Sequence, residues 1–151
     1  MDKEKMLLRM TRLCSMREYC RNDIRRKLAS LPEADAEEVL ETLCRENYLD
    51  DRRYARAFAR DKSALQGWGN LKIKLALQRK GIDGADIDAA LAEIDTEAAG
   101  ARKEQLLRAK WNALRNESDP SRKQARFFRY ALGRGYGYEE IKRIYDYLRR
   151  D

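Results

Sequence analysis

Apolar side chains recur at helical spacing along the chain, most clearly between residues 48 and 59. There, two aspartates precede apolar positions spaced i, i+1, i+4 and i+5, which lie on one face of a helix. These apolar positions are Tyr54, Ala55, Phe58 and Ala59. Because an aspartate carboxylate accepts the free N–H groups of a first helical turn, Asp50 or Asp51 is the expected N-cap. The pattern therefore predicts an amphipathic helix that ends near Ala64.

The same periodicity continues through the rest of the chain, and no segment alternates as a strand does. Two prolines and eight glycines are the only strong punctuation. The predicted fold class is therefore all-α. The other expected helices begin at or near Asp2, Ser15, Asp35, Asn70, Asp83, Glu97, Asp119 and Gly137.

Helix starts and stops can be assigned from capping residues. Ser15 with Glu18 has the spacing of a capping box, as do the residues from Asp35 to Glu38. Pro32 is expected to end the helix that Ser15 opens. One face of that helix would carry Cys20, Ile24, Lys27, Leu28 and Leu31 inward, and Arg17, Arg21 and Arg25 would form a line on another.

The apolar pattern repeats. Residues 73–91 superpose on residues 127–145 at a shift of 54, which pairs Gly81 with Gly135, and each of these glycines is expected to end a helix. Less neatly, residues 23–28 match residues 76–81. We interpret this as tandem units of two or three short helices, which form a modular, elongated and curved chain. The predicted segments are an N-terminal helix and three repeats, with the limits 1–14, 15–64, 65–116 and 117–151.

Charge adds a prediction about partners. The net charge is +7, and residues 101–151 carry 14 basic and 7 acidic side chains, whereas residues 1–50 carry 10 and 11. Such a surplus favours a polyanionic partner, most often nucleic acid. The alternative is a basic but merely solvated surface.

Other features lower the expectation of an enzyme or a membrane protein. The chain has no histidine, and its three cysteines lack a CxxC spacing, so we interpret them as core residues in a reducing cytoplasm. Asp50 and Asp51 form a weak candidate for a metal-binding pair, because adjacent side chains at a helix start diverge. No apolar run reaches the length of a membrane helix, and residues 1–10 lack the apolar centre of a signal peptide, so neither feature is expected.

Basic side chains at helical spacing are the candidate contacts for filament or DNA, with a solvated surface as the alternative for each group. Asp50 and Asp51 are expected to cap a helix, to pair locally with Arg53 or to contact a partner. The full set of basic candidates is Arg17, Arg21, Arg25, Arg26, Arg52, Arg53, Lys72, Lys74, Arg79, Lys80, Arg122, Lys123, Arg126, Arg129 and Arg134.

Three motifs give the chain a family resemblance. Residues 23–28 (DIRRKL) are similar to an EL-x-x-KL pattern, residues 49–55 (LDDRRYA) to an LDD-x-RFA element, and residues 69–82 continue the order. Together they resemble the RecX family, bacterial regulators of the RecA recombinase. Ala76 stands where that family usually has Glu, and Tyr54 where it has Phe.

The resemblance implies tandem three-helix repeats, similar to helix-turn-helix units, that bind in the groove of the RecA filament on single-stranded DNA. It implies inhibition of the filament's ATPase, strand exchange and coprotease activities by a cytoplasmic, monomeric protein without cofactor or metal. The rival hypothesis is a stand-alone, non-specific nucleic-acid binder. A catalytic role is a third hypothesis, which metal-dependent DNA cleavage would favour.

Overall fold

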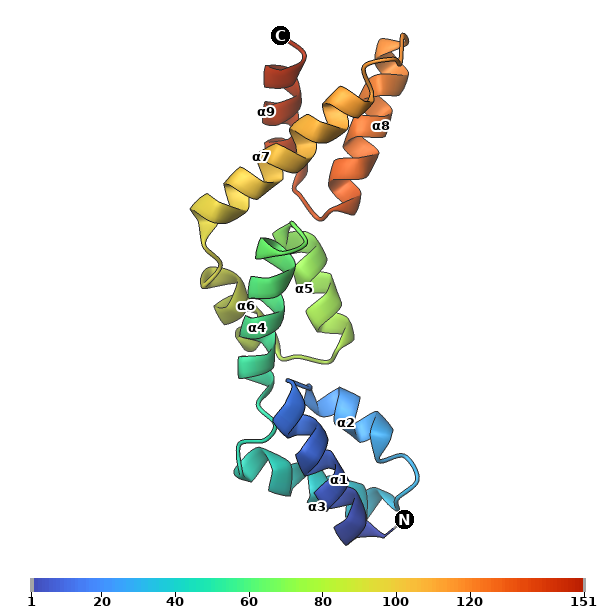
Figure 1. Ribbon diagram of the computed structural model, residues 1–151, viewed down its shortest axis with the longest axis vertical. Coiled ribbons are helices and arrows are strands. Elements are labelled where there is room, and N and C mark those ends of the chain that lie inside the picture. Colours follow the sequence, from blue (N-terminus) through green and yellow to red (C-terminus); the bar gives the residue numbers. More distant parts are fainter. Residues whose placement is uncertain (1, 151) are drawn as a thin grey trace. The chain divides into compact units, whose positions relative to one another are not determined.

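The computed structural model describes residues 2–150, which contain nine α-helices and no strand (Figure 1). The predicted all-α class is confirmed. The helices are α1 (Lys3–Met16), α2 (Arg21–Lys27), α3 (Glu33–Arg45), α4 (Asp51–Ala64), α5 (Asn70–Arg79), α6 (Gly84–Ala92), α7 (Thr96–Ala113), α8 (Pro120–Gly133) and α9 (Tyr138–Leu148).

The helices form two compact units. Unit 1 comprises residues 1–58 and 77–90, and unit 2 comprises residues 59–76 and 91–151. Helices α4, α5 and α6 each contribute residues to both units. The predicted repeat limits at residues 14, 64 and 116 stay predictions.

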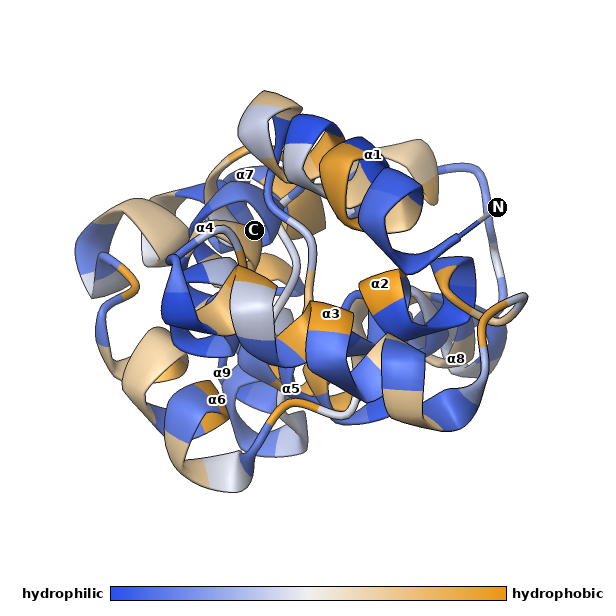
Figure 2. Ribbon diagram, turned by 90° about the horizontal axis from the view of Figure 1, so that it is seen from below, coloured by the Kyte–Doolittle hydropathy of each residue, from blue (hydrophilic) through white to orange (hydrophobic). Residues whose placement is uncertain are grey.

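Unit 1 is built around the packing of α1, α2 and α3, whose hydrophobic residues are interspersed among hydrophilic ones (Figure 2). Ile24 of α2 and Leu40 and Leu43 of α3 are fully buried, and Met10 of α1 is 2% exposed. Each fully buried side chain of this size contributes about 1.5–3 kcal/mol, so short helices are held by their shared core.

Unit 2 has an aromatic core between α7, α8 and α9. Phe127 is fully buried and meets Trp111 edge-on, with ring centroids 5.7 Å apart. Tyr145 packs against the same Trp111 ring at 5.6 Å. Such edge-to-face pairs each add about 0.5–1.5 kcal/mol beyond the burial of area, so α8 and α9 are fixed firmly against α7.

The predicted capping box at Ser15 is wrong. Helix α1 continues through Met16, and the Ser15 hydroxyl donates a 2.8 Å hydrogen bond to the Thr11 carbonyl within the helix. Helix α2 begins only at Arg21, after the buried Cys20. Arg17 therefore lies at the end of α1 and does not form a line with Arg21 and Arg25 on one helix.

The neighbouring boundaries also differ from prediction. Pro32 precedes α3 at its N-cap position, so Asp35 lies inside the first turn instead of capping the helix. Helix α2 ends at Lys27, and Lys27 is exposed instead of facing the core. The first free N–H groups of α3 suit the acidic residues of its first turn, which explains the shifted start.

Several expected caps are confirmed. The Arg53 N–H donates to the Asp50 carboxylate at 3.1 Å, so Asp50 is the cap of α4. Asp119 accepts from the Ser121 N–H at 2.9 Å, with Pro120 at the first helical position. The Gly137 N–H donates to Glu140 at 2.6 Å, as the predicted start of α9 requires.

The two paired glycines end their helices in the same way. Gly81 and Gly135 have φ values of +76° and +95°, which side chains rarely adopt. The next residue in each case, Ile82 or Tyr136, bonds back to the last turn, with N–O distances of 3.2 and 3.3 Å. These turns are the local structure behind the 54-residue shift.

In each glycine turn, a backbone carbonyl accepts a hydrogen bond from a residue at the start of another helix of the same unit. In unit 1, the Cys20 thiol at the start of α2 donates to the Lys80 carbonyl at 3.9 Å. In unit 2, the Gly69 N–H at the start of α5 donates to the Arg134 carbonyl at 2.7 Å. We call each of these contacts a glycine joint. In unit 2 the turn carbonyl satisfies an N–H group at a helix start, which lacks a partner within its own helix; in unit 1 it accepts from a side chain instead.

Candidate partner-binding surfaces

A basic pocket of about 410 Å³ lies on unit 1, and we call it the Tyr19 pocket. Its lining combines the end of α1, helix α2 and the turn after α5. The lining holds four cationic side chains and one carboxylate. Its residues are Arg17, Tyr19, Asp23, Arg26, Lys27 and Lys80.

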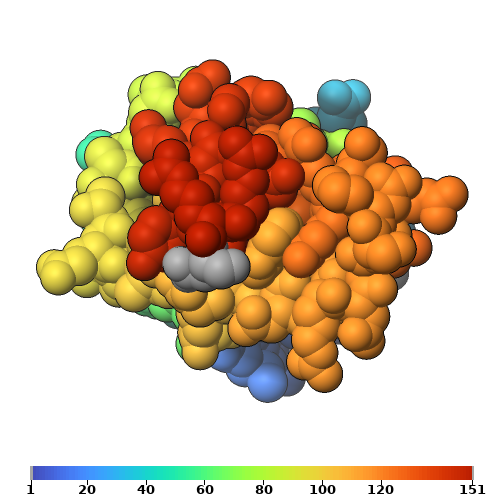
Figure 3. Space-filling view, turned by 90° about the horizontal axis from the view of Figure 1, so that it is seen from above, coloured from blue at the N-terminus to red at the C-terminus, as the bar shows by residue number. Residues whose placement is uncertain are grey.

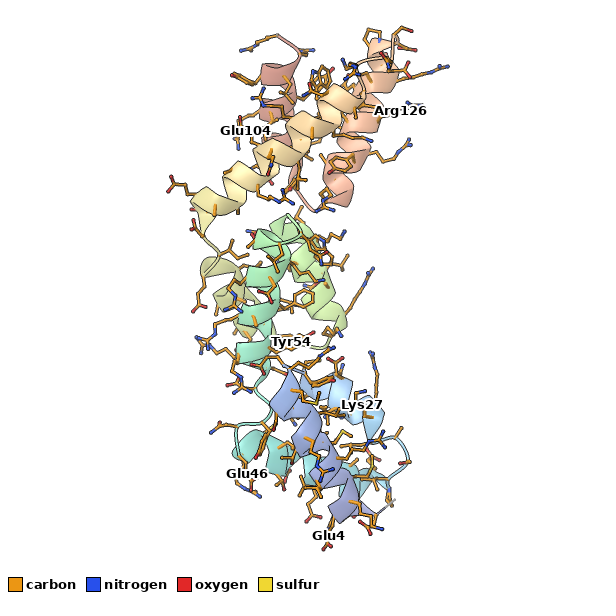
Figure 4. All side chains as sticks on the ribbon, viewed as in Figure 1. Glu4, Lys27, Glu46, Tyr54, Glu104 and Arg126 are labelled. Carbon is orange, nitrogen blue, oxygen red and sulfur yellow. The ribbon has the colours of Figure 1, made fainter. Side chains whose placement is uncertain are left out.

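The Tyr19 ring gathers two of the cations. The Arg17 guanidinium carbon lies 4.4 Å from the ring centroid, and the Lys27 ammonium lies 5.7 Å from it. Both cations are exposed, and Figure 4 labels Lys27 on α2. Cation–π contacts of this kind are worth about 0.5–1 kcal/mol at exposed sites, enough to orient the charges without neutralising them.

The single carboxylate of the pocket is already paired. The Asp23 carboxylate is 2.9 Å from the Lys80 ammonium, and the Asp23 side chain is 12% exposed. Partial burial opposes ionisation of Asp23, but hydrogen bonds from Lys80 and Cys20 outweigh it and hold the pKa of Asp23 below its ordinary value. The Asp23 hydrogen bond in turn raises the pKa of Lys80. Arg17, Arg26 and Lys27 therefore remain as uncompensated positive charge.

The Asp51 side chain caps the start of α2 and not that of its own helix, α4. Its carboxylate accepts the Arg21 N–H at 2.8 Å, across 30 residues of sequence. Burial raises the pKa of Asp51 despite this hydrogen bond. Asp50 caps α4 and Asp51 caps α2, so the two carboxylates act on different helices.

Arg53 is held inside unit 1. Its guanidinium binds the Glu18 carboxylate through two hydrogen bonds of 2.5 and 3.1 Å, and it donates to the Asn47 carbonyl at 3.1 Å. The predicted local pairing with Asp50 or Asp51 through the Arg53 side chain is therefore replaced by a distant partner. Through these bonds Arg53 links the segment that connects α1 to α2 with the segment that connects α3 to α4.

The remaining candidates of unit 1 differ in availability. Arg25 binds Glu37 at 3.2 Å. Arg52 and Arg79 are exposed and form no ion pair within residues 2–150. Exposed single ion pairs are worth about 0–1 kcal/mol, so Arg25 can still exchange Glu37 for a partner's carboxylate.

A second basic surface lies on α8 of unit 2, and we call Arg122, Lys123, Arg126 and Arg129 the α8 basic face. Arg122 and Arg126 approach Asp119 and Glu117 only loosely, at 3.8 and 3.7 Å. Arg129 is exposed and has no ion pair among the described residues. Figure 3 shows the exposed surface of the C-terminal helices, and Figure 4 labels Arg126 on α8.

Aromatic rings accompany cations on unit 2 as well. The Lys123 ammonium lies 3.9 Å from the Trp111 ring centroid, and the Lys72 ammonium lies 4.3 Å from the Trp68 ring centroid. Lys74 projects from the exposed side of α5. Arg134 differs from these, because its Nε atom is buried without a hydrogen-bond partner in the described structure.

A second pocket of about 420 Å³ in unit 2 is more apolar. Leu71, Leu91 and Ile94 contribute to its lining, and its charged pair is Lys103 with Glu140 at 2.8 Å. Burial opposes ionisation of Glu140, but bonds from Lys103 and the Gly137 N–H outweigh it and lower its pKa. Because this pair is internally neutral, the pocket offers little attraction to anions.

The described residues contain no cluster of three or more acidic, cysteine or histidine side chains that could hold a metal ion. None of the described helices combines the length and apolarity that crossing a membrane requires. Asp50 and Asp51, the candidate metal pair, are both engaged with backbone N–H groups at helix starts.

The structure brings together residues that the sequence pattern left apart. Arg17, Arg26 and Lys80 share the Tyr19 pocket, although Lys80 is distant in sequence. Tyr19 and Lys27 were missed as candidates. The sequence shows only an aromatic residue two positions after Arg17 and eight before Lys27. That spacing does not indicate a shared pocket unless the fold is known.

Known proteins share this helical architecture. A family model described as "RecX, second three-helix domain" matches residues 50–91, which contain α4, α5 and all but the last residue of α6. The crystal structure titled RecX from Lactobacillus salivarius aligns with a TM-score of 0.82, at 22% identity over 99% of this chain and 97% of that one. These similarities define a protein of the all-α class built from three-helix domains.

Sequence relatives identify the family. The Regulatory protein RecX of Pectobacterium atrosepticum is 33% identical over 87% of this chain and 90% of its own length. That of Serratia proteamaculans is 30% identical over 93% and 95%. The chain belongs to the RecX family of regulatory proteins. It spans about half the length of the clostridial relatives, for example 46% of the Clostridium botulinum protein at 36% identity.

Proposed function

We propose that this protein binds the RecA filament on single-stranded DNA and inhibits its ATPase, strand-exchange and coprotease activities. The observation that carries the proposal is the alignment with a Regulatory protein RecX over 90% of that relative's length. The motifs at residues 23–28, 49–55 and 69–82 carry the same family resemblance.

The surfaces described above are compatible with such a partner. A filament on DNA presents both phosphates and protein carboxylates, so a protein that binds it benefits from cations with distinct surroundings. Both units supply them, at the Tyr19 pocket and at the α8 basic face. The protein would act as a cytoplasmic monomer without cofactor or catalysis of its own.

The test is the single-stranded-DNA-dependent ATPase of the cognate recombinase, measured with and without this protein across a salt series. Inhibition that persists at a salt concentration that abolishes binding to bare DNA is the expected result. Inhibition that only follows competition for bare DNA, or no inhibition, would refute the proposal.

A second candidate function is non-specific binding of nucleic acid without a recombinase. The observation that favours it is the α8 basic face, which has four cations on a helix without a carboxylate. Phosphate contacts of this type carry no sequence information and weaken steeply with salt. Equal inhibition of any enzyme that uses single-stranded DNA would support this alternative.

A further inference from the structure

The two basic surfaces differ in their electrostatic surroundings. Helix α8 contains four cations and no carboxylate in its 14 residues. Helix α3, which packs beside α2 in unit 1, contains five carboxylates and one arginine in its 13 residues. The cations of unit 1 therefore lie next to a helix with a large excess of carboxylates, whereas α8 packs against α9, which carries three carboxylates and two cations.

This acidic border disfavours nucleic acid at the Tyr19 pocket. A phosphate backbone is a continuous line of negative charge, and the helix packed beside α2 carries Glu37, which binds Arg25 at 3.2 Å, and the exposed carboxylates of Glu33 and Glu41. Repulsion at these residues would offset the attraction of Arg26 and Lys27. A mixed border instead complements a protein surface, on which acidic groups stand beside basic ones.

The interior of the pocket also suits a discrete carboxylate. Asp23 is neutralised by Lys80, so the uncompensated cations are Arg17, Arg26 and Lys27. Arginine offers a planar fork that matches a carboxylate through two hydrogen bonds. The contacts of Arg17 and Lys27 with the Tyr19 ring hold two of these charges beside a single side chain.

We propose that the Tyr19 pocket binds an acidic protein segment, whose aspartate or glutamate side chains pair with Arg17, Arg26 and Lys27. Nucleic-acid phosphates bind instead on the α8 basic face. The proposal rests on the proposed function for the identity of the partner, which would be the protein component of the filament. The pocket chemistry can be tested without any recombinase.

The experiment is a titration of the full chain, followed by amide ¹H–¹⁵N spectra, with two separate probes. One probe is a short poly-glutamate peptide, and the other is single-stranded oligo(dT). The peptide is expected to shift the amides of Tyr19 and Arg26, and the oligonucleotide those of Lys123 and Arg129.

Charge-reversal variants sharpen the assignment. Arg26→Glu is expected to weaken the affinity for the peptide on the order of tenfold while leaving the affinity for oligo(dT) nearly unchanged. Arg129→Glu is expected to do the reverse. Arg12→Glu, an exposed position on α1 outside the pocket, is the matched control with the same change of net charge. Because Arg26 forms no ion pair among the described residues, thermal unfolding should show an intact fold.

Three results would overturn the assignment. The first is peptide shifts that fall on α8 instead of the pocket. The second is equal weakening by Arg26→Glu and Arg12→Glu, which would indicate a general charge effect. The third is a loss of oligo(dT) affinity in Arg26→Glu as large as the loss of peptide, which would make the pocket a phosphate site. Inhibition of the recombinase ATPase is measured separately, so its absence would refute the proposed function alone.

Discussion

The backbones of Gly69 and Gly135 lie in direct contact. A Cβ atom on Gly69 would stand 2.3 Å from the Gly135 carbonyl oxygen, and one on Gly135 would stand 2.4 Å from the Cβ of Lys72. The Gly69 N–H meanwhile donates to the neighbouring Arg134 carbonyl. Glycine is thus required at both positions, although they are 66 residues apart. The hydrogen bond at this joint brings the two main chains so close that a side chain on either residue would clash.

We expect Gly69→Ala to lower the free energy of unfolding by about 2–3 kcal/mol, because a methyl group must displace backbone. Urea denaturation measures this. Gly100→Ala is the matched control, since a Cβ there meets no atom within 4 Å and Gly100 lies inside α7. The control should be more stable by about 0.5–1 kcal/mol. If Gly69→Ala left the free energy of unfolding unchanged, the close backbone contact at this joint would be contradicted.

We expect Arg53→Lys to lower the free energy of unfolding by about 1–2 kcal/mol, because lysine cannot form the two-pronged bond to Glu18 or reach the carbonyls as well. Arg52→Lys, an exposed neighbour without an ion pair among the described residues, should change it by less than about 0.5 kcal/mol. Equal effects of the two variants would show that the Glu18 contact adds nothing to stability.

Stability should decrease in acid. The folded pKa values of Asp23 and Glu140 are depressed, so both carboxylates bind protons more weakly in the folded chain than in the unfolded one. Their contribution is complete above the unfolded pKa values of about 4 and is lost as the pH falls through the lower folded values. Asp51 acts in the opposite sense, because burial raises its folded pKa.

Chemical unfolding across pH 2 to 7, as an approximate range, tests this linkage. Asp23→Asn should show a flatter decrease below about pH 4 than the unmodified chain. Asp51→Asn should instead change the profile above about pH 4, where it removes the gain in stability that protonation of Asp51 gives as the pH falls through its raised folded pKa. Identical pH profiles for both variants would contradict the assignment of these carboxylates.

Binding to bare single-stranded DNA should fall with salt. Each phosphate contact contributes about 0.7 to the slope of log affinity against log salt, so Arg129→Gln should reduce that slope by roughly this amount. Arg12→Gln, exposed on α1, is the control and should leave the slope unchanged. Filter binding or fluorescence anisotropy measures both. A slope that Arg129→Gln does not alter would remove Arg129 from the DNA contact.

The sequence by itself determined the features that depend on neighbours along the chain. Helical periodicity, the Asp119-Pro120 start and the glycine ends at Gly81 and Gly135 were all predicted, because each is decided within one or two turns. The family motifs are likewise short, contiguous patterns.

Tertiary structure decided what depends on distant partners. The Ser15 box failed because Glu18 pairs with Arg53, and α2 starts where Cys20 is buried and Asp51 supplies a cap from another helix. The Tyr19 pocket likewise needs Lys80 beside Asp23, 57 positions away. Local spacing cannot encode these choices, since burial and long-range hydrogen bonds outweigh the few tenths to one or two kcal/mol that a cap contributes.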